Sequence, residues 1–230
     1  MKSVLHFYKL KGIIAFTLIT CFLSCKTNVP TDTPVGNAHI AMINAAPGTA
    51  AINFYYTGNK INTIPLVYGN TTGYRNLISG SREIQIKANL TNKMLTANTV
   101  RLKQDSSYSF FVYEANNTIT TAISYDDLSN PSVGNAKIRL VNLSAGLSSA
   151  DLYITNGPQL SSSISFGSIG IYQELKAGTY NFDLRLHGSN NLLLNIPNVR
   201  LDNGKTYTMW SGGSVKGSGS TALFTQIIIQ

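Results

Sequence analysis

Histidines would be the most recognisable catalytic residues in this chain, and they are few. Nucleophilic hydrolysis by serine needs a general base within hydrogen-bond reach of the nucleophile. Beyond the N-terminal segment the histidines are His39, in an alternating strand pattern, and His187, in a turn-like run over residues 186–191. Neither belongs to a GxSxG or HExxH pattern. We therefore expect no catalytic residue, no metal site and no cofactor, and we expect that the protein is not an enzyme.

Carboxylates offer a second route to chemistry, because glycosidases need only a pair of them. The ten acidic residues are dispersed, and Asp126 and Asp127 are the only adjacent pair. No EF-hand spacing accompanies this pair. We expect it to form a turn or to order a junction between domains, with a calcium-ligand role as the alternative.

Two tyrosines are the candidate binding surface. Tyr55 and Tyr153 alternate with apolar residues, which predicts side chains on the strand face away from the core. Exposed aromatic rings stack on sugars or pack against protein partners. The alternative is that they cover a sheet edge or a contact between domains. Trp210, the only tryptophan, is expected to pack in the interior instead of forming a ligand platform.

Cys25 carries the one chemical modification that the sequence indicates. It follows a basic start, an apolar stretch over residues 12–23, and Ser24. This order is typical of a secretory signal with a small residue before the cleavage point. A cysteine directly after that point resembles the lipobox of bacterial lipoproteins, in which the thiol is acylated. We interpret residues 1–24 as a signal peptide, Cys25 as the lipidation site and residues 25–36 as a lipid tether.

Other interpretations of this segment stay open. Ser24 also suits an ordinary cleaved signal peptide, and an uncleaved anchor is a further alternative. The apolar stretch is shorter than the ~20 residues that span a bilayer. Cys21 is the other possible acceptor, but it follows Thr20, which is bulkier than Ser24. The expected location is the bacterial cell envelope, on the periplasmic or the surface side of the outer membrane.

Charge and cysteine content exclude several classes of function. Removal of the signal leaves 15 basic residues against 10 acidic ones, without any run of lysine or arginine. Nucleic-acid binding would need a clustered basic patch, so no nucleic-acid partner is expected. The only cysteines are Cys21 and Cys25, so the folded part has neither disulfides nor cysteine nucleophiles. Its stability must come from an apolar core.

The chain repeats itself. Residues 35–44 return as residues 133–142 at a shift of 98, which also aligns Tyr74 with Tyr172. One inserted residue later, Tyr108 aligns with Tyr207. A register held over such a length predicts two homologous domains in tandem. We place them at residues 37–130 and 131–230, separated by a short polar linker that includes Pro131 and Gly134.

Each copy has the pattern of strands. Ile40 and Met42 alternate with more polar neighbours, and Ile138 and Leu140 do the same in the second copy, which predicts a half-buried strand. Further strands are expected over residues 52–56, 64–68, 82–87, 94–102, 108–113, 118–125 and 223–229. Without any sustained helical period, the fold class is all-β. Short strands at this spacing favour two tandem immunoglobulin-like β-sandwich domains after a lipoprotein signal peptide.

A tyrosine near a late strand sharpens this expectation. Tyr108 and Tyr207 resemble the tyrosine corner of immunoglobulin-like domains, whose hydroxyl bonds back to the main chain. Phe110 and Met209 would then occupy the core position two residues later. An ordinary strand tyrosine is the alternative interpretation.

A family resemblance rests on several segments, namely residues 38–48, 53–56, 136–142, 150–154, 175–180 and 204–208. Together they resemble the family catalogued as domain of unknown function 4397. The resemblance implies immunoglobulin-like β modules in secreted and lipid-anchored proteins of Bacteroidota-type bacteria. Its motifs are strand cores and turns, so it transfers no catalytic residue.

The functional expectation is a lipid-anchored cell-envelope protein that serves as a non-enzymatic binding or structural module. Its partners would be the membrane, through the N-terminal lipid, and a protein or glycan. One alternative is a carbohydrate-binding surface lipoprotein that uses Tyr55 and Tyr153. Another is a subunit of a surface assembly that uses strand donation, in which the apolar end at residues 227–229 is either the donor or an internal strand.

Overall fold

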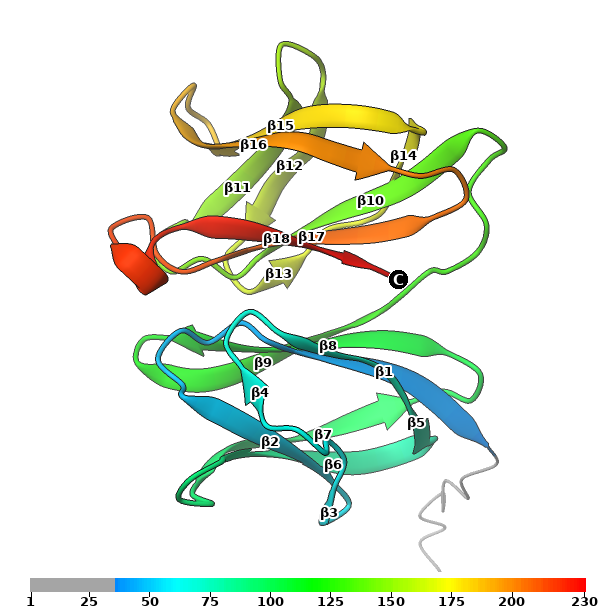
Figure 1. Cartoon of the computed structure of the whole chain (residues 1–230), viewed down its shortest axis with the longest axis vertical. Coiled ribbons are helices and arrows are strands. Elements are labelled where there is room, and N and C mark those ends of the chain that lie inside the picture. The colour runs from blue at the N-terminus through cyan, green and yellow to red at the C-terminus, as the bar shows by residue number, and fades with distance from the viewer. Residues whose placement is uncertain (1–35) are drawn as a thin grey trace, which may run out of the picture. The chain divides into compact units, whose positions relative to one another are not determined.

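Strands make up almost all of the regular structure in residues 36–230, the part of the chain that this computed structural model describes (Figure 1). The first copy contains β1 (Asn37–Asn44), β2 (Ala51–Tyr56), β3 (Asn59–Lys60), β4 (Leu66–Val67), β5 (Thr71–Ile78), β6 (Gly80–Ala88), β7 (Met94–Leu102), β8 (Ser107–Ala115) and β9 (Thr118–Tyr125). The expected signal peptide, Cys25 and nearly all of the expected tether lie outside the described residues.

The second copy repeats this series. It contains β10 (Asn135–Asn142), β11 (Ser149–Ile154), β12 (Gln159–Ser165), β13 (Ser168–Ile169), β14 (Gln173–Lys176), β15 (Gly178–Leu186), β16 (Leu192–Leu201), β17 (Thr206–Gly212) and β18 (Phe224–Ile229). A single 3₁₀ turn, Gly219–Thr221, is the one helical element in the described range. The predicted all-β class is therefore confirmed.

Each copy forms a sandwich of two sheets. In the first sandwich, a sheet with the strand order β5-β1-β8-β9 faces a sheet with the order β3-β2-β6-β7, in which β4 also pairs with β2. In the second, β13-β10-β17-β18, with β14 on β10, faces β12-β11-β15-β16. We call the sheets that contain β1 and β10 the inner sheets, and the sheets that contain β2 and β11 the outer sheets.

Apolar residues between the two sheets fill each sandwich. Ile40, Met42, Phe54, Ile84 and Phe110 lie fully buried in the first core. Ile138, Leu140, Leu152, Phe182 and Met209 occupy the corresponding places in the second. Burial of a side chain of this size contributes roughly 1.5–3 kcal/mol, so each copy has a core of its own.

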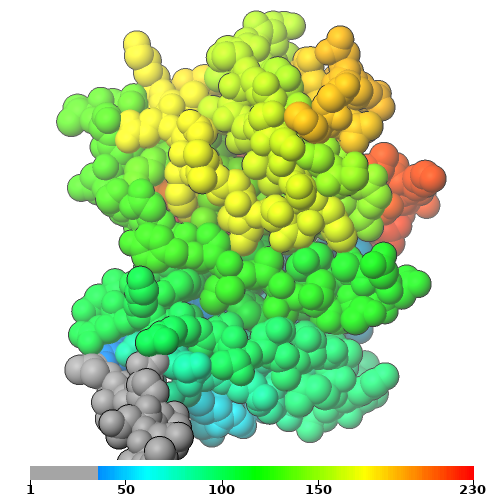
Figure 2. All heavy atoms as spheres, turned by 180° about the vertical axis from the view of Figure 1, so that it is seen from behind, coloured from blue at the N-terminus to red at the C-terminus, as the bar shows by residue number. Residues whose placement is uncertain are grey.

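A third core joins the two inner sheets. Ala41, Ile43, Ala45 and Phe111 of the first sandwich pack with Val141, Leu143 and Trp210 of the second. In the space-filling view side chains fill the spaces that the ribbons leave open (Figure 2). The half-buried strands expected from the alternation are therefore wrong for β1 and β10. Both of their faces are buried, because the face opposite each sandwich core meets the other sandwich.

The sandwich architecture is confirmed, but its strand order is not that of an immunoglobulin domain. In a constant-type immunoglobulin domain the first two strands share a sheet. Here β1 and β2 lie in opposite sheets, and β1 pairs in parallel with β8, just as β10 pairs in parallel with β17. The immunoglobulin-like description therefore holds for the two-sheet architecture and not for the order of strands.

The tyrosine corners form in both copies. The backbone N–H of Lys103 donates to the Tyr108 hydroxyl at 3.0 Å, and the N–H of Asp202 donates to the Tyr207 hydroxyl at 2.9 Å. Phe110 and Met209, two residues later, are fully buried in the respective cores. These hydroxyls satisfy backbone donors where β7 and β16 end, and so they fix how the chain enters β8 and β17.

β5 is the longest strand that the pattern analysis misses. β5 has a mostly exposed sequence that includes Gly73 at φ 63°, and only Leu77 is buried. It is an edge strand that pairs with β1 on one side. Without alternating apolar residues, its sequence carries no strand signal, and pairing with β1 alone defines it.

Candidate binding surfaces

Tyr55 and Tyr153 lie on the outer faces of the outer sheets, as their strand parity predicted. Each ring is half-buried beneath a basic side chain. The Lys87 ammonium lies 4.4 Å from the Tyr55 ring centroid, and the Arg185 guanidinium carbon lies 4.7 Å from that of Tyr153. Lys87 and Arg185 stand at the same shift of 98. Both copies therefore keep an aromatic and cationic pair at one position of the sheet.

A polar pair accompanies each tyrosine. The Asn53 side-chain amide donates to Oδ1 of Asn89 at 3.0 Å. At the same positions of the second copy, Asp151 Oδ1 lies 2.9 Å from Nδ1 of His187. The interpretation of His187 as an isolated turn residue missed this contact. The shift of 98 that relates Asn53 to Asp151 and Asn89 to His187 was the signal available to find it.

His39 and Trp210, the other histidine and aromatic residue considered above, contact neighbouring residues of the fold. His39 Nδ1 lies 2.7 Å from Oδ1 of Asn76 on the neighbouring strand β5. Trp210 is fully buried in the third core, where its ring meets Phe224 edge to face. The prediction that Trp210 packs in the interior is confirmed, although it packs between the sandwiches and not inside one of them.

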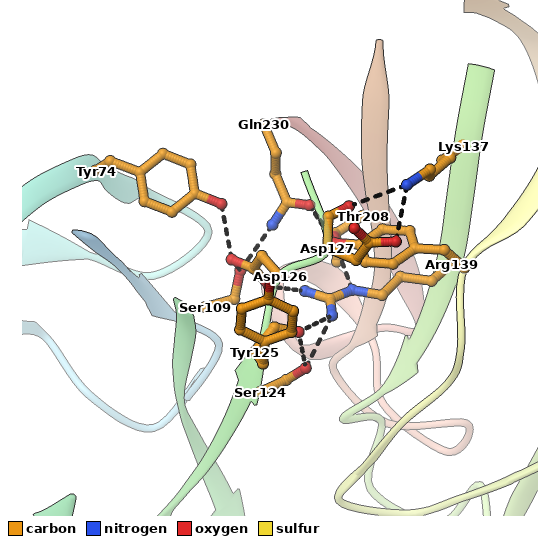
Figure 3. A network of polar contacts seen from close by, with 11 residues as sticks. Tyr74, Ser109, Ser124, Tyr125, Asp126, Asp127, Lys137, Arg139, Thr208 and Gln230 are labelled. Carbon is orange, nitrogen blue, oxygen red and sulfur yellow. Dashed lines mark hydrogen bonds and ion pairs between the residues drawn. The ribbon is translucent and has the colours of Figure 1, made fainter. Parts of the chain in front are cut away.

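The stretch expected to be a polar linker begins with a buried ion pair. Asp126 is almost fully buried and pairs with Nη2 of Arg139, itself buried on β10 (Figure 3). The other Asp126 oxygen accepts hydrogen bonds from the Tyr74 hydroxyl at 2.7 Å and the Ser109 hydroxyl at 2.8 Å. Of the three roles left open for this aspartate, ordering the junction is the one that this geometry favours.

Each of the three guanidinium nitrogens of Arg139 also donates a hydrogen bond. Its Nε donates to Thr208 Oγ1 at 3.0 Å, and Nη1 donates to Ser124 Oγ at 2.8 Å. Its guanidinium carbon lies 4.4 Å from the centroid of the Tyr172 ring. A buried ion pair stabilises a fold only when further hydrogen bonds compensate its desolvation, and here both partners have them.

The network contains the same triad twice. Tyr74, Asp126 and Ser109 in the first copy correspond by register to Tyr172, Gln230 and Thr208 in the second. Gln230 Oε1 accepts hydrogen bonds from the hydroxyls of Tyr172 and Thr208, while its Nε2 donates to Ser109 Oγ at 2.8 Å. The two copies therefore meet through equivalent residues. The main difference between the two triads is the ion pair. Arg139 of the second copy pairs with Asp126, whereas the same position of the first copy holds Ala41, which cannot pair with Gln230.

The surroundings shift several pKa values in this region. Burial, followed by the charge of Asp126, raises the pKa of Tyr74 well above its usual range. Burial also raises the pKa of Tyr172 to about 12, against an opposing effect of Arg139. A hydrogen bond from Lys137, at 2.8 Å, is the largest cause that lowers the pKa of Asp127 to about 2. These groups keep fixed protonation states at neutral pH, which suits a structural role.

The C-terminal segment forms the edge strand β18 of its own domain. β18 pairs along its length with β17 in the same sheet. Ile227 packs against the second core and Ile228 against the third. Of the two roles left open for residues 227–229, the structure shows the strand within its own sheet.

No group of three or more His, Cys, Asp or Glu side chains within residues 36–230 is placed to hold a metal ion. Nor does the same range contain a helix with the length and apolar character needed to cross a bilayer.

Comparison with solved structures finds remote likenesses, of which three follow. The C-terminal domain of AlgF from P. aeruginosa has a TM-score of 0.31 at 17% identity, covering 44% of this chain and 100% of that domain. A family 26 carbohydrate-binding module of Eubacterium rectale Amy13K, solved with maltoheptaose, has a TM-score of 0.28 at 12% identity, covering 84% and 96%. A structure described as alpha-glucan binding by a streptococcal virulence factor has a TM-score of 0.27 at 10% identity, covering 82% and 97%.

Comparison with curated proteins finds no match. One family model matches residues 38–153, from β1 of the first sandwich to β11 of the second, and its description is a domain of unknown function. That match spans half of the chain and agrees with the segments of the first copy that suggested the family. The chain belongs to the DUF4397 family of domains of unknown function.

Proposed function

We propose that the chain is a non-enzymatic binding protein of the bacterial cell envelope, anchored to the outer membrane through an acylated Cys25. The order of basic, apolar and small residues before Cys25 supports the anchor. The folded part then presents its outer sheets to a protein or glycan partner.

One observation carries the binding role. Both copies place a tyrosine beneath a basic side chain on the outer face of the outer sheet. That face packs in neither sandwich core nor in the third core. Tyrosine and arginine are enriched where partners bind most strongly, because they combine apolar area with directed polar contacts. Two divergent copies that keep such a pair favour a shared use of this face.

The hydrogen bonding of the histidines supports a non-enzymatic role. Within residues 36–230, His39 bonds to an asparagine and His187 bonds to an aspartate. No hydroxyl nucleophile is bonded to either ring in that range. The Asp151 carboxylate that orients His187 also accepts the backbone N–H of Ser163 at 2.7 Å, so it stabilises the strand beside it.

Mass spectrometry of the processed N-terminus tests the anchor. We expect a mature chain that begins at Cys25 and carries acyl chains, and we expect Cys25→Ser to abolish both processing and acylation. A mature N-terminus without lipid would contradict the anchor but leave the binding role intact.

A glycan array and affinity capture with envelope extracts test the binding faces. We expect the double variant Tyr55→Ala/Tyr153→Ala to lose the partner that the unaltered chain retains. Tyr125→Ala, which removes an exposed tyrosine on β9, serves as the control and should retain binding. Equal binding by all three proteins would show that the tyrosine faces are not the contact surface.

A further inference from the structure

Two adjoining hollows open at one end of the first sandwich. Loops that join β1 to β2, β6 to β7 and β8 to β9 meet there (Figure 1). The second hollow lies between the sandwiches, because loops of the second copy also line it through Leu143, Ala145, Gly213, Ser214 and Thr221. Their volumes are about 360 Å³ and about 410 Å³, which is within the range of small-molecule sites. Gly48, Glu114 and Asn117 line both hollows.

Glu114 is a carboxylate without a bonded partner in the described part of the chain. It is half-buried at the end of β8. Its carboxylate lies against Gly48 so closely that a Cβ at this glycine would come within 2.5 Å of Oε2. Gly48 therefore leaves room for the acid, which faces the hollows with its acceptor oxygens available.

Amide groups surround this acid. Oδ1 of Asn89 is already bonded to Asn53, so its amide N–H groups remain available as donors. Asn117 projects from the two-residue turn between β8 and β9, where Asn116 and Asn117 have φ values of 50° and 59°. Positive φ at both positions is the mark of a type I′ hairpin turn, which asparagine tolerates well.

The remaining lining sets the chemistry of a ligand. Ile52, Leu95 and Ile119 give the first hollow an aliphatic wall, and Ser214 and Thr221 add hydroxyl groups to the second. Lysine, arginine and histidine are absent from both linings, and so are aromatic residues. An anionic ligand would be repelled by Glu114, and a quaternary ammonium ligand would lack the aromatic cage that it prefers.

We propose that these hollows bind a neutral carbohydrate. Adjacent sugar hydroxyls donate to the Glu114 carboxylate and accept hydrogen bonds from the amides of Asn89 and Asn117. The apolar C–H face of the ring packs on Leu95 and Ile119. Neither Tyr55 nor Tyr153 lines the hollows, although Asn89 also bonds to Asn53 beside Tyr55. The site does not depend on the anchor at Cys25.

The second copy lacks an equivalent. Gly213 stands where Glu114 does in the first copy, at the shift that relates Tyr108 to Tyr207. The connection from β17 to β18 is also much longer than the two-residue turn between β8 and β9. One carbohydrate per chain is therefore expected at this site.

Titration against neutral oligosaccharides identified on a glycan array tests the proposal with the full chain. Glu114→Gln keeps the shape of the side chain and removes its charge. Because a hydrogen bond to a charged acceptor is about twice as strong as one to a neutral acceptor, we expect affinity to fall roughly tenfold. Glu83→Gln, at an exposed position on β6, is the matched control and should leave affinity unchanged. Thermal unfolding of both variants verifies that each is folded.

The outcomes separate this site from the tyrosine faces. Loss with Glu114→Gln and retention with Tyr55→Ala/Tyr153→Ala support the proposal, with one sugar bound per chain. Loss only in the tyrosine variant overturns it and supports the outer faces instead. Preference for uronate-containing or amine-bearing probes, or no binding to any glycan on the array, also overturns it.

Discussion

At the scale of single residues, the most consequential contact is the pair of Asp126 and Arg139. Both side chains are buried, and their charged groups contact hydrogen-bond partners and the Tyr172 ring. In the sister copies the same positions hold Gln230 and Ala41, which carry no charge. The duplicated fold therefore exists with and without charge at these positions, and each charge needs the other.

Substitution of Arg139 alone should lower the unfolding free energy more than substitution of Arg139 and Asp126 together. Arg139→Ala leaves Asp126 charged and unpaired in the interior, for which we expect a loss of about 3–5 kcal/mol in unfolding free energy. Adding Asp126→Gln restores the uncharged group found in the sister copy, and we expect it to recover about 1–3 kcal/mol. Urea unfolding of the two single variants and the double variant measures this coupling. Additive losses would show that the two side chains act independently.

At the scale of elements, turns and corners position the strands more than propensity does. Tyr108 and Tyr207 each accept a backbone N–H at the close of the preceding strand, with nearly the same geometry in both copies. This contact is local in sequence, so the motif could be predicted from the residues alone. β5, in contrast, has no apolar alternation and depends on its partner β1.

Loss of a corner hydroxyl should destabilise its sandwich. Tyr207 is almost fully buried, so Tyr207→Phe leaves the Asp202 N–H without its acceptor. We expect a cost of about 1–3 kcal/mol, the usual range for an unsatisfied buried donor. Chemical denaturation measures it, with Tyr125→Phe as a control, because Tyr125 is 58% exposed and its change should cost almost nothing. If both variants lower the unfolding free energy by the same small amount, the hydroxyl of the tyrosine corner does not stabilise the sandwich.

At the scale of the whole molecule, the third core makes the two sandwiches interdependent. Ile43 and Phe111 are as completely buried between the inner sheets as any residue inside a sandwich. Equivalent strands of the two copies meet there, and equivalent triads of polar residues lie beside them. The arrangement is that of an isologous contact between two copies, made within one chain.

A single sandwich should therefore not remain a monomer in solution as a well-packed domain does. A fragment of residues 36–130 would expose Ile43, Phe111 and Ala41 on one face, together with an unpaired Asp126. We expect it to self-associate and to bind a hydrophobic dye that the full chain does not bind. Analytical ultracentrifugation and dye fluorescence report the two effects. A stable, monomeric fragment would mean that the third core contributes little.

Alkaline pH should weaken the same contact. Tyrosines of the unfolded chain ionise near pH 10, whereas burial raises the pKa of Tyr172 to about 12. A raised folded pKa gives stability that is complete below pH 10 and is lost as the pH rises from about 10 to 12. Unfolding experiments across this window should show the decline, and Tyr172→Phe should reduce its slope. A slope unchanged by that substitution would assign the loss to other groups.

The sequence by itself determined the duplication, the all-β class and most strand positions, and it indicated both tyrosine corners. It did so because period-two alternation and local turns are written in neighbouring residues. It also gave Tyr55 and Tyr153 their outward parity, but not the basic side chains above their rings.

Only the tertiary structure decided what covers the second faces of β1 and β10. Alternation of apolar and polar residues indicates one buried face, and it does not indicate what packs on the other. The pairing of Asp126 with Arg139 and the meeting of Gly48, Asn89 and Glu114 at one hollow likewise join residues far apart in sequence. Spacing carries no signal for such contacts, because they depend on how sheets pack and loops converge.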